Sequence, residues 1–167
     1  MESTILLSVI FGIIIVGILI YALYNNSNKV DSKQLSAVNT TSPLQLQAYE
    51  RLILLVDRIA LTNMISRTPD DGLSARDMQH LLTKNIREEF DYNVTQQMYV
   101  TPESWNAIKN LKEKNILFIN QAAIELAPEA TGMDLKKILV NFLMNEPKAN
   151  LHELVSEALS FEAKKYL

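Results

Sequence analysis

Hydrophobic residues along this chain fall into two patterns, one continuous and one periodic. The continuous pattern runs from Ile5 to Leu23, where 16 of 19 residues are apolar and none is charged. At a rise of about 1.5 Å per residue, a helix of this length spans about 28 Å, close to the thickness of the hydrocarbon core of a bilayer. The run therefore predicts a transmembrane anchor within residues 1–24, with the membrane as its partner.

A cleaved signal peptide is the alternative interpretation of this run. Such a peptide has a basic start, a shorter apolar segment and a cleavage site with small residues. Only Glu2 and the terminal amine precede the run here, and bulky side chains stand at its end, so an anchor is favoured. Lys29 and Lys33 follow the run, and the positive-inside rule then favours a cytoplasmic location for the rest of the chain.

Residues 25–42 are rich in Asn, Ser and Thr and show no apolar period. We interpret them as a flexible linker, which as a random coil would have a root-mean-square reach of about 25 Å. The predicted organisation is an anchor at 1–24, this linker, and a helical soluble domain at 43–167.

The periodic pattern begins after the linker, with apolar side chains recurring at spacings of three and four, as in amphipathic helices. Five helices are expected, at 43–66, 75–92, 102–127, 132–145 and 151–166. In the first, the expected core positions are Leu52, Ile53, Val56, Ile59, Ala60 and Met64. In the last, they are Leu151, Leu154, Val155, Ala158, Leu159 and Phe161.

Ser74, Thr101 and Thr131 each precede an expected helix, and their side chains can accept hydrogen bonds from the free N–H groups of its first turn. The segment from Val94 to Val100 is too short and isolated for a sheet, so we expect an extended loop there. The predicted fold class is all-α: one N-terminal transmembrane helix, a flexible tether, and a bundle of about five helices.

Composition excludes several kinds of chemistry. The chain has no Cys, 16 Lys and Arg against 19 Asp and Glu, and a net charge of −3. Thiol chemistry and thiolate metal sites are therefore excluded, and the absence of a basic cluster argues against nucleic-acid binding. His80 and His152 lack partners at metal-ligand spacing, and no glycine-rich phosphate loop is present. We expect no cofactor and no enzymatic activity.

One apolar stripe lies opposite the core face of the first expected helix. It consists of Leu54, Leu61 and Ile65, with acidic residues (Glu50, Asp57) along one edge and basic residues (Arg51, Arg58) along the other. An apolar seam with charged edges is typical of a coiled-coil contact, so one hypothesis is self-association or partner binding through this stripe. The alternative is that another helix of the same domain covers it.

The densest acidic stretch lies at the end of the second expected helix. Lys84 with Glu88 and Arg87 with Asp91 are spaced to pair on the helix surface. Glu89 is left over, close to the apolar face. A structural ion pair with another helix is the favoured role for Glu89, and acid–base catalysis is the alternative.

Two sequence blocks resemble a known family. They are Leu44–Leu52 and the stretch from Ile86 through Asn93, Gln96-Gln97 and Tyr99-Val100 to Trp105. Together they are similar to an uncharacterised bacterial family, a domain of unknown function with one N-terminal transmembrane helix. The resemblance covers the chain to about Ala127. It implies a bacterial inner-membrane protein with a helical domain, and it implies no activity, cofactor or catalytic residue.

The resemblance singles out a set of mainly polar positions: Tyr49, Glu50, Arg51, Arg58, Glu89, Asn93, Gln96, Gln97 and Trp105. We interpret them as a packed polar junction, in which Arg51 or Arg58 pairs with Glu89 and the two Gln side chains bond loop backbone groups. A binding groove is the alternative.

These observations give a leading hypothesis and two alternatives. The leading one is a membrane-anchored interaction or scaffold module that binds a protein partner or itself. The second is a membrane-tethered ligand-binding or enzymatic domain that uses the region from Glu89 to Gln97. The third is a structural subunit that is stable only within a larger envelope complex.

Overall fold

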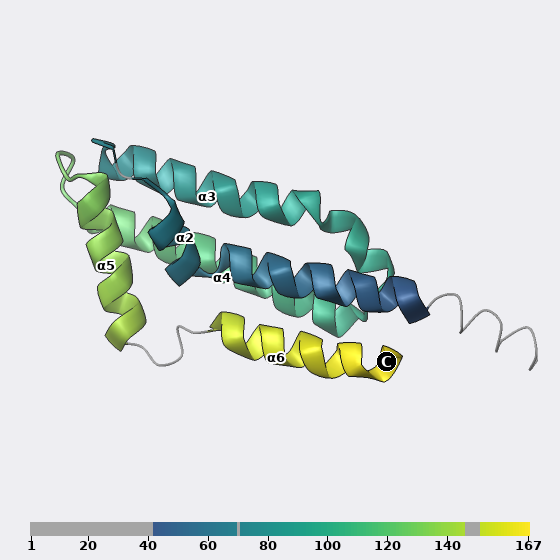
Figure 1. Ribbon diagram of the computed structural model, residues 1–167. Coiled ribbons are helices and arrows are strands. Elements are labelled where there is room, and N and C mark those ends of the chain that lie inside the picture. The colour runs from purple at the N-terminus through teal and green to yellow at the C-terminus, as the bar shows by residue number, and fades with distance from the viewer. Residues whose placement is uncertain (1–41, 70, 146–150) are drawn as a thin grey trace, which may run out of the picture. The chain divides into compact units, whose positions relative to one another are not determined.

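The computed structural model describes residues 42–69, 71–145 and 151–167, and residues 43–167 form one compact unit. These ranges contain a helix at 42–59, α2 (Leu61–Arg67), α3 (Ala75–Tyr92), α4 (Pro102–Ile124), α5 (Gly132–Asn145) and α6 (Leu151–Ala163), with short 3-10 helices η1 (Val94–Met98) and η3 (Lys164–Tyr166) (Figure 1). The all-α prediction is confirmed for this part of the chain.

No helix in the described ranges is long and apolar enough to cross a membrane. The predicted span from Ile5 to Leu23 and all of the predicted linker except Ser42 lie outside these ranges.

The 42–59 helix, α3, α4 and α6 lie lengthwise, each opposite in direction to the one named before it (Figure 1). The 42–59 helix and α4 run in the same direction, because Tyr49 lies beside Thr101 and Ile59 beside Asn115. The helix α3 runs the opposite way, and Phe90 near its end packs on Trp105 near the start of α4. The helix α6 also runs back, so that the rings of Tyr166 and Tyr49 stack with their centroids 5.7 Å apart. Of the two other helices, α5 contacts α3, α4 and the short α2.

The interior of this unit is apolar and is built from every lengthwise helix. Its largest fully buried side chains are Tyr49, Leu52, Leu55, Ile59, Met64, Met78, Leu82, Ile86, Ile108, Ile119, Leu135 and Leu139. Burial of apolar area at about 25 cal/mol per Å² is the main stabilising contribution for such a bundle. The core positions predicted from helical spacing in the first helix are confirmed, since all but the half-buried Ile53 are fully covered.

The first expected helix, 43–66, is broken, so the prediction of one continuous helix is wrong. Ala60 has φ −56° and ψ 129°, which is extended backbone, and α2 restarts at Leu61. A break of this kind leaves backbone carbonyls without helical partners.

Side chains satisfy these carbonyls at the break. Asn63 Nδ2 donates to the carbonyl of Asp57 at 2.9 Å, and Arg67 Nη2 donates to that of Arg58 at 2.6 Å. Asn115 of α4 donates to that of Ile59 at 2.7 Å. The partners that stabilise the break lie up to 56 residues away in sequence, so helical periodicity does not reveal it.

The predicted helix starts at Ser74, Thr101 and Thr131 are confirmed. Each hydroxyl accepts a hydrogen bond from the backbone N–H three residues on, at 3.1, 3.2 and 3.3 Å respectively. The Asp134 carboxylate in turn accepts a hydrogen bond from the backbone N–H of Thr131 at 3.1 Å, which completes a reciprocal capping box. Ser74 and Thr131 also pair as an isolated antiparallel bridge, so the starts of α3 and α5 lie together.

Other boundaries differ from the prediction in places. The helices expected at 75–92 and 132–145 are found with those bounds, whereas α4 ends at Ile124, before the expected 127. The expected extended loop after α3 is wrong, because Val94–Met98 form the 3-10 helix η1. Backbone bonds such as Gln96 N to Asn93 O at 3.0 Å satisfy this short segment internally.

Candidate functional site

Arg58 and Glu89 form an ion pair between the 42–59 helix and α3, one of the two pairings predicted for Glu89. The Arg58 Nη1 to Glu89 Oε2 distance is 3.3 Å, and the two side chains are 52% and 27% exposed. Solvent screening limits such a pair to about 1 kcal/mol or less. The pair therefore links the two helices but contributes little to the stability of the domain.

Asn93 ends α3 and is fully engaged there. It is buried, and its Nδ2 donates to the carbonyl of Glu89 at 2.9 Å. Its backbone N–H donates to the carbonyl of Phe90 at 3.0 Å. Asn93 thus satisfies carbonyls at the C-terminus of α3.

Tyr49 belongs to a different cluster, at the start of α4. Its buried hydroxyl accepts a hydrogen bond from the backbone N–H of Thr101 at 3.3 Å and lies 3.5 Å from the Ser104 hydroxyl. Burial raises the pKa of the neighbouring Tyr166 phenol, and Tyr49 contributes to that shift. Trp105 is half-buried against Phe90, with ring centroids 5.0 Å apart.

The predicted polar junction is thus divided rather than continuous. Arg58, Glu89 and Asn93 form one group, and Tyr49 lies with the start of α4 in another. Glu50, Arg51 and Gln97 are exposed. The Gln96 side chain donates a hydrogen bond to the Thr95 hydroxyl at 3.4 Å. The hydrogen bonds predicted from Gln96 and Gln97 to loop backbone groups are not among the described contacts.

A shallow groove lies beside the Arg58–Glu89 pair, between the α2 region and α3. Its lining includes Arg58, Arg67, Asn85, Glu89 and Tyr92. Arg67 donates to the Arg58 carbonyl and Arg58 pairs with Glu89, so both guanidinium groups already hold partners. The groove offers balanced charges to a ligand and favours neither an anion nor a cation.

The three residues of the predicted seam do not share one exposed face. Leu61 and Ile65 lie on α2 and are buried in the core, because the break at Ala60 turns them inward. Leu54, on the 42–59 helix, is exposed. The alternative, that the domain itself covers the stripe, holds for Leu61 and Ile65.

The outer face of α6 carries an apolar stripe made of Leu154, Ala158 and Phe161, which we call the α6 stripe. All three are exposed, and Phe161 is 67% exposed. Their prediction as core positions is therefore wrong. The inward face of α6 is formed by the buried residues Leu159 and Ala163, and one helical face cannot bury both sets.

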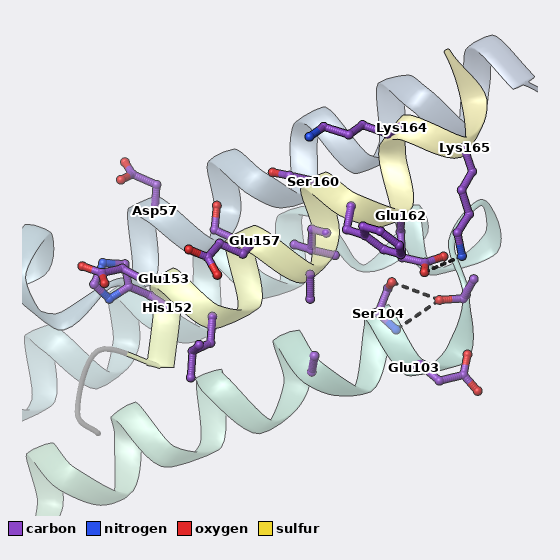
Figure 2. A pocket seen from close by; sticks show the side chains of 17 residues that line it. Asp57, Glu103, Ser104, His152, Glu153, Glu157, Ser160, Glu162, Lys164 and Lys165 are labelled. Atoms are coloured by element: carbon purple, nitrogen blue, oxygen red, sulfur yellow. Dashed lines mark hydrogen bonds and ion pairs between the residues drawn. The ribbon is translucent and has the colours of Figure 1, made fainter. Parts of the chain in front are cut away.

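An open groove runs along α6, and the α6 stripe lines it together with Glu103, Ser104 and Ala107 of α4. Figure 2 shows Glu103 and Ser104 beside one edge of α6 and Asp57 of the 42–59 helix beside the other. Lys165 bonds Glu162 at 2.7 Å, and this bond raises the pKa of the Lys165 ammonium. The Lys165 ammonium also lies 5.5 Å from the Phe161 ring centre.

Sequence reasoning missed the α6 stripe because all apolar positions of the helix were assigned to the core. The sequence did indicate an excess, since six apolar positions in about three turns are more than one packed face of a peripheral helix needs.

The described residues contain no group of three or more His, Asp or Glu side chains that could hold a metal ion. His80 is exposed on α3, and His152 is half-buried at the start of α6.

The chain matches one protein-family model across residues 2–166, a family of unknown function (DUF7935). No curated protein matches the chain, and no solved structure matches it.

Proposed function

The chain belongs to DUF7935, a family of unknown function, and we propose that it is a membrane-anchored module whose helical domain binds a protein partner. The observation that carries this proposal is the α6 stripe. Leu154, Ala158 and Phe161 recur at spacings of four and three, so they form a continuous apolar line on a helix. Exposed apolar patches with polar borders are typical of protein-binding surfaces.

The chemistry beside the stripe indicates the kind of partner. Glu103, Glu157 and Lys164 border it, which gives an apolar line with charges of both signs at its edges. An amphipathic helix with apolar residues at spacings of three and four fits such a surface. The partner would add a further helix beside α6 and α4.

The proposed location follows from the first part of the sequence. The Ile5–Leu23 run would anchor the chain in a bacterial inner membrane, and Lys29 and Lys33 favour a cytoplasmic domain. A reporter fused to the C-terminus, active only on one side of the membrane, tests the orientation.

Ligand binding near Glu89 to Gln97 remains a second candidate with weaker support. The groove there is lined by charged side chains that already pair with one another. A ligand would have to break the Arg58–Glu89 pair or bind beside it.

The experiment is site-specific photocrosslinking in cells with the full-length protein. Benzoylphenylalanine at position 161 replaces one aromatic side chain with another, and position 110, exposed on α4, is the control. We expect one discrete adduct from position 161 and none from position 110.

The substitution Phe161→Ser should reduce recovery of the same partner, whereas Val140→Ser, at an exposed apolar residue of α5, should not. Equal crosslinking at positions 161 and 110, or full recovery with Phe161→Ser, would contradict the proposed surface. An adduct of twice the chain mass would identify a second copy of this chain as the partner.

A further inference from the structure

Five stretches of at least eight residues in the described domain carry no charged residue, although 21% of the whole chain is charged: 42–49, 59–66, 92–102, 115–124 and 138–145. Two of them, 42–49 and 92–102, contain the start of the 42–59 helix and the connection from α3 to α4. The second contains η1 and the residues on either side of it. Long uncharged surface segments are unusual in a soluble domain, whose exposed face is normally rich in Lys, Glu, Arg and Asp.

The fold brings these two segments to the same end of the bundle. The backbone N–H of Thr101 donates to the Tyr49 hydroxyl at 3.3 Å, so the start of α4 lies against the 42–59 helix near its beginning. The 3-10 helix η1 joins the end of α3 to the start of α4 at this end (Figure 1). We call this surface, made of 42–49 and 92–102, the uncharged end.

Apolar and aromatic side chains are exposed on the uncharged end. Leu44, Val94 and Met98 reach solvent there, and exposed Tyr92 lies at the edge, where it also lines the groove beside the Arg58–Glu89 pair. Between them lie uncharged polar side chains such as Gln97. Tyr side chains, with an apolar ring and a polar hydroxyl, favour the headgroup region of a bilayer.

Charged residues border this surface along the chain. Asp91 and Glu103 flank the second segment, Glu50 and Arg51 follow the first, and Lys164 and Lys165 lie on η3. Long basic side chains in such a position can extend to lipid headgroups while an apolar surface inserts. The arrangement is an apolar and uncharged face with a charged border.

The chain enters the domain at this same end. The described domain begins at residue 42, and this first residue of the 42–59 helix lies within the uncharged end. A linker of 18 residues reaches at most about 60 Å when extended and about 25 Å on average as a coil. The 42–59 helix is itself about 27 Å long. An anchor at 5–23 would therefore tether the domain through this end.

We propose that the uncharged end docks on the headgroup region of a lipid bilayer, with Leu44, Tyr92, Val94 and Met98 inserted at shallow depth. This inference rests on the proposed membrane anchor and adds the orientation of the domain. The α6 stripe then runs away from the bilayer, where a cytoplasmic partner can reach it.

The test uses the full-length protein in lipid nanodiscs, with an environment-sensitive nitrobenzoxadiazole label on a single introduced cysteine. The chain has no native Cys, so one substitution gives one label. Met98→Cys places it on the uncharged end, and Ile124→Cys places the control at the far end of α4. These side chains are 74% and 81% exposed, so neither substitution disturbs the core.

We expect blue-shifted emission from the label at position 98 and quenching by lipids that carry a spin label near the headgroup. The label at position 124 should show neither effect. Adding Val94→Glu to the Met98→Cys protein should reverse the blue shift, because a charge in the inserted face opposes docking.

Equal, unshifted emission at both positions would overturn the inference. A blue shift at position 98 without lipid quenching would also overturn it and would indicate a protein occupant. Flotation of the unlabelled chain with vesicles tests the anchor separately. Flotation without a shift at position 98 would leave the anchor standing and contradict only the docking, whereas loss of flotation would contradict both.

Discussion

Asn115 of α4 donates a hydrogen bond of 2.7 Å from its side-chain nitrogen to the backbone carbonyl of Ile59, 56 residues earlier in the chain. Asn115 is buried, and the carbonyl belongs to the last residue of the 42–59 helix. The contact satisfies one of the backbone groups that the break at Ala60 removes from helical bonding. It therefore joins a local irregularity of the first helix to the middle of α4.

Asn115→Ala should destabilise the domain by about 1–3 kcal/mol, because it leaves the buried carbonyl of Ile59 without a donor. Urea unfolding followed by circular dichroism measures the change. Asn110→Ala, at an exposed position of the same helix, is the matched control and should change stability by less than about 0.5 kcal/mol. Equal effects of the two substitutions would contradict the role assigned to Asn115.

Two glycines should respond to substitution for different reasons. Gly72 has φ +74° and open space around its Cα, so Gly72→Ala should cost about 1–2 kcal/mol through backbone strain alone. Gly132 has an ordinary φ, but an added Cβ would lie 3.2 Å from both the Leu73 carbonyl oxygen and Met78 Cβ. Gly132→Ala should cost about 1–3 kcal/mol through overpacking.

Asparagine separates the two causes, since it tolerates positive φ better than alanine and is larger. Gly72→Asn should be milder than Gly72→Ala, whereas Gly132→Asn should be more severe than Gly132→Ala. Thermal melting of the four variants gives the comparison. The same rank order at both sites would show that one of the two explanations is wrong.

The capping box at the start of α5 should make stability depend on acid pH. Hydrogen bonds from the Thr131 hydroxyl and backbone lower the pKa of the Asp134 carboxyl below its ordinary value. For a lowered pKa, the stabilisation is complete above the unfolded value of about 3.9 and is lost as the pH falls through the folded value. The advantage of the native protein over Asp134→Asn should therefore shrink between neutral pH and about pH 3.

Urea midpoints at the two pH values measure this difference, with the exposed Glu129→Gln as control. Thr131→Ala should cost about 1 kcal/mol at neutral pH through loss of the cap. A difference between native protein and Asp134→Asn that does not change with pH would contradict the assignment.

Glu89→Gln should lower stability only slightly, by about 1 kcal/mol or less, because the Arg58–Glu89 pair is partly exposed. Added salt should reduce the difference from the native protein, since screening weakens the pair. Thermal melting at low and high salt measures it, and Glu88→Gln, which removes the more exposed pair with Lys84, is the control. Unchanged melting together with a lost cellular function would favour the ligand-binding hypothesis for this region.

Local features of the helices could be predicted well from the sequence. The bounds of α3 and α5 agree with the predicted 75–92 and 132–145, because Ser74 and Thr131 cap their own first turns. Such caps depend on residues three apart, and no distant contact is needed to form them. The Arg58–Glu89 ion pair was one of two predicted possibilities. The sequence indicated that Glu89 pairs with a basic residue, but it did not distinguish Arg58 from Arg51.

The break at Ala60 and the exposure of the α6 stripe could not be predicted in the same way. Ala60 favours helix by its own propensity, and its extended conformation is stabilised by distant partners such as Asn115. Leu154 and Phe161 have the spacing of core residues, yet α6 packs against the bundle on one side only. Helical periodicity predicts which side chains share an apolar face of a helix. Whether another helix packs on that face depends on the tertiary structure.

The sequence by itself determined the helical class of the domain, the starts of α3, α4 and α5, and the uncharged character of 42–49 and 92–102. These properties depend on residue type and on neighbours within about one helical turn. Only the tertiary structure decided that Leu61 and Ile65 turn inward, that Phe161 stays outside, and that the two uncharged segments meet at one end. Each of these depends on contacts between residues far apart in the chain, whose geometry is fixed when the helices pack together.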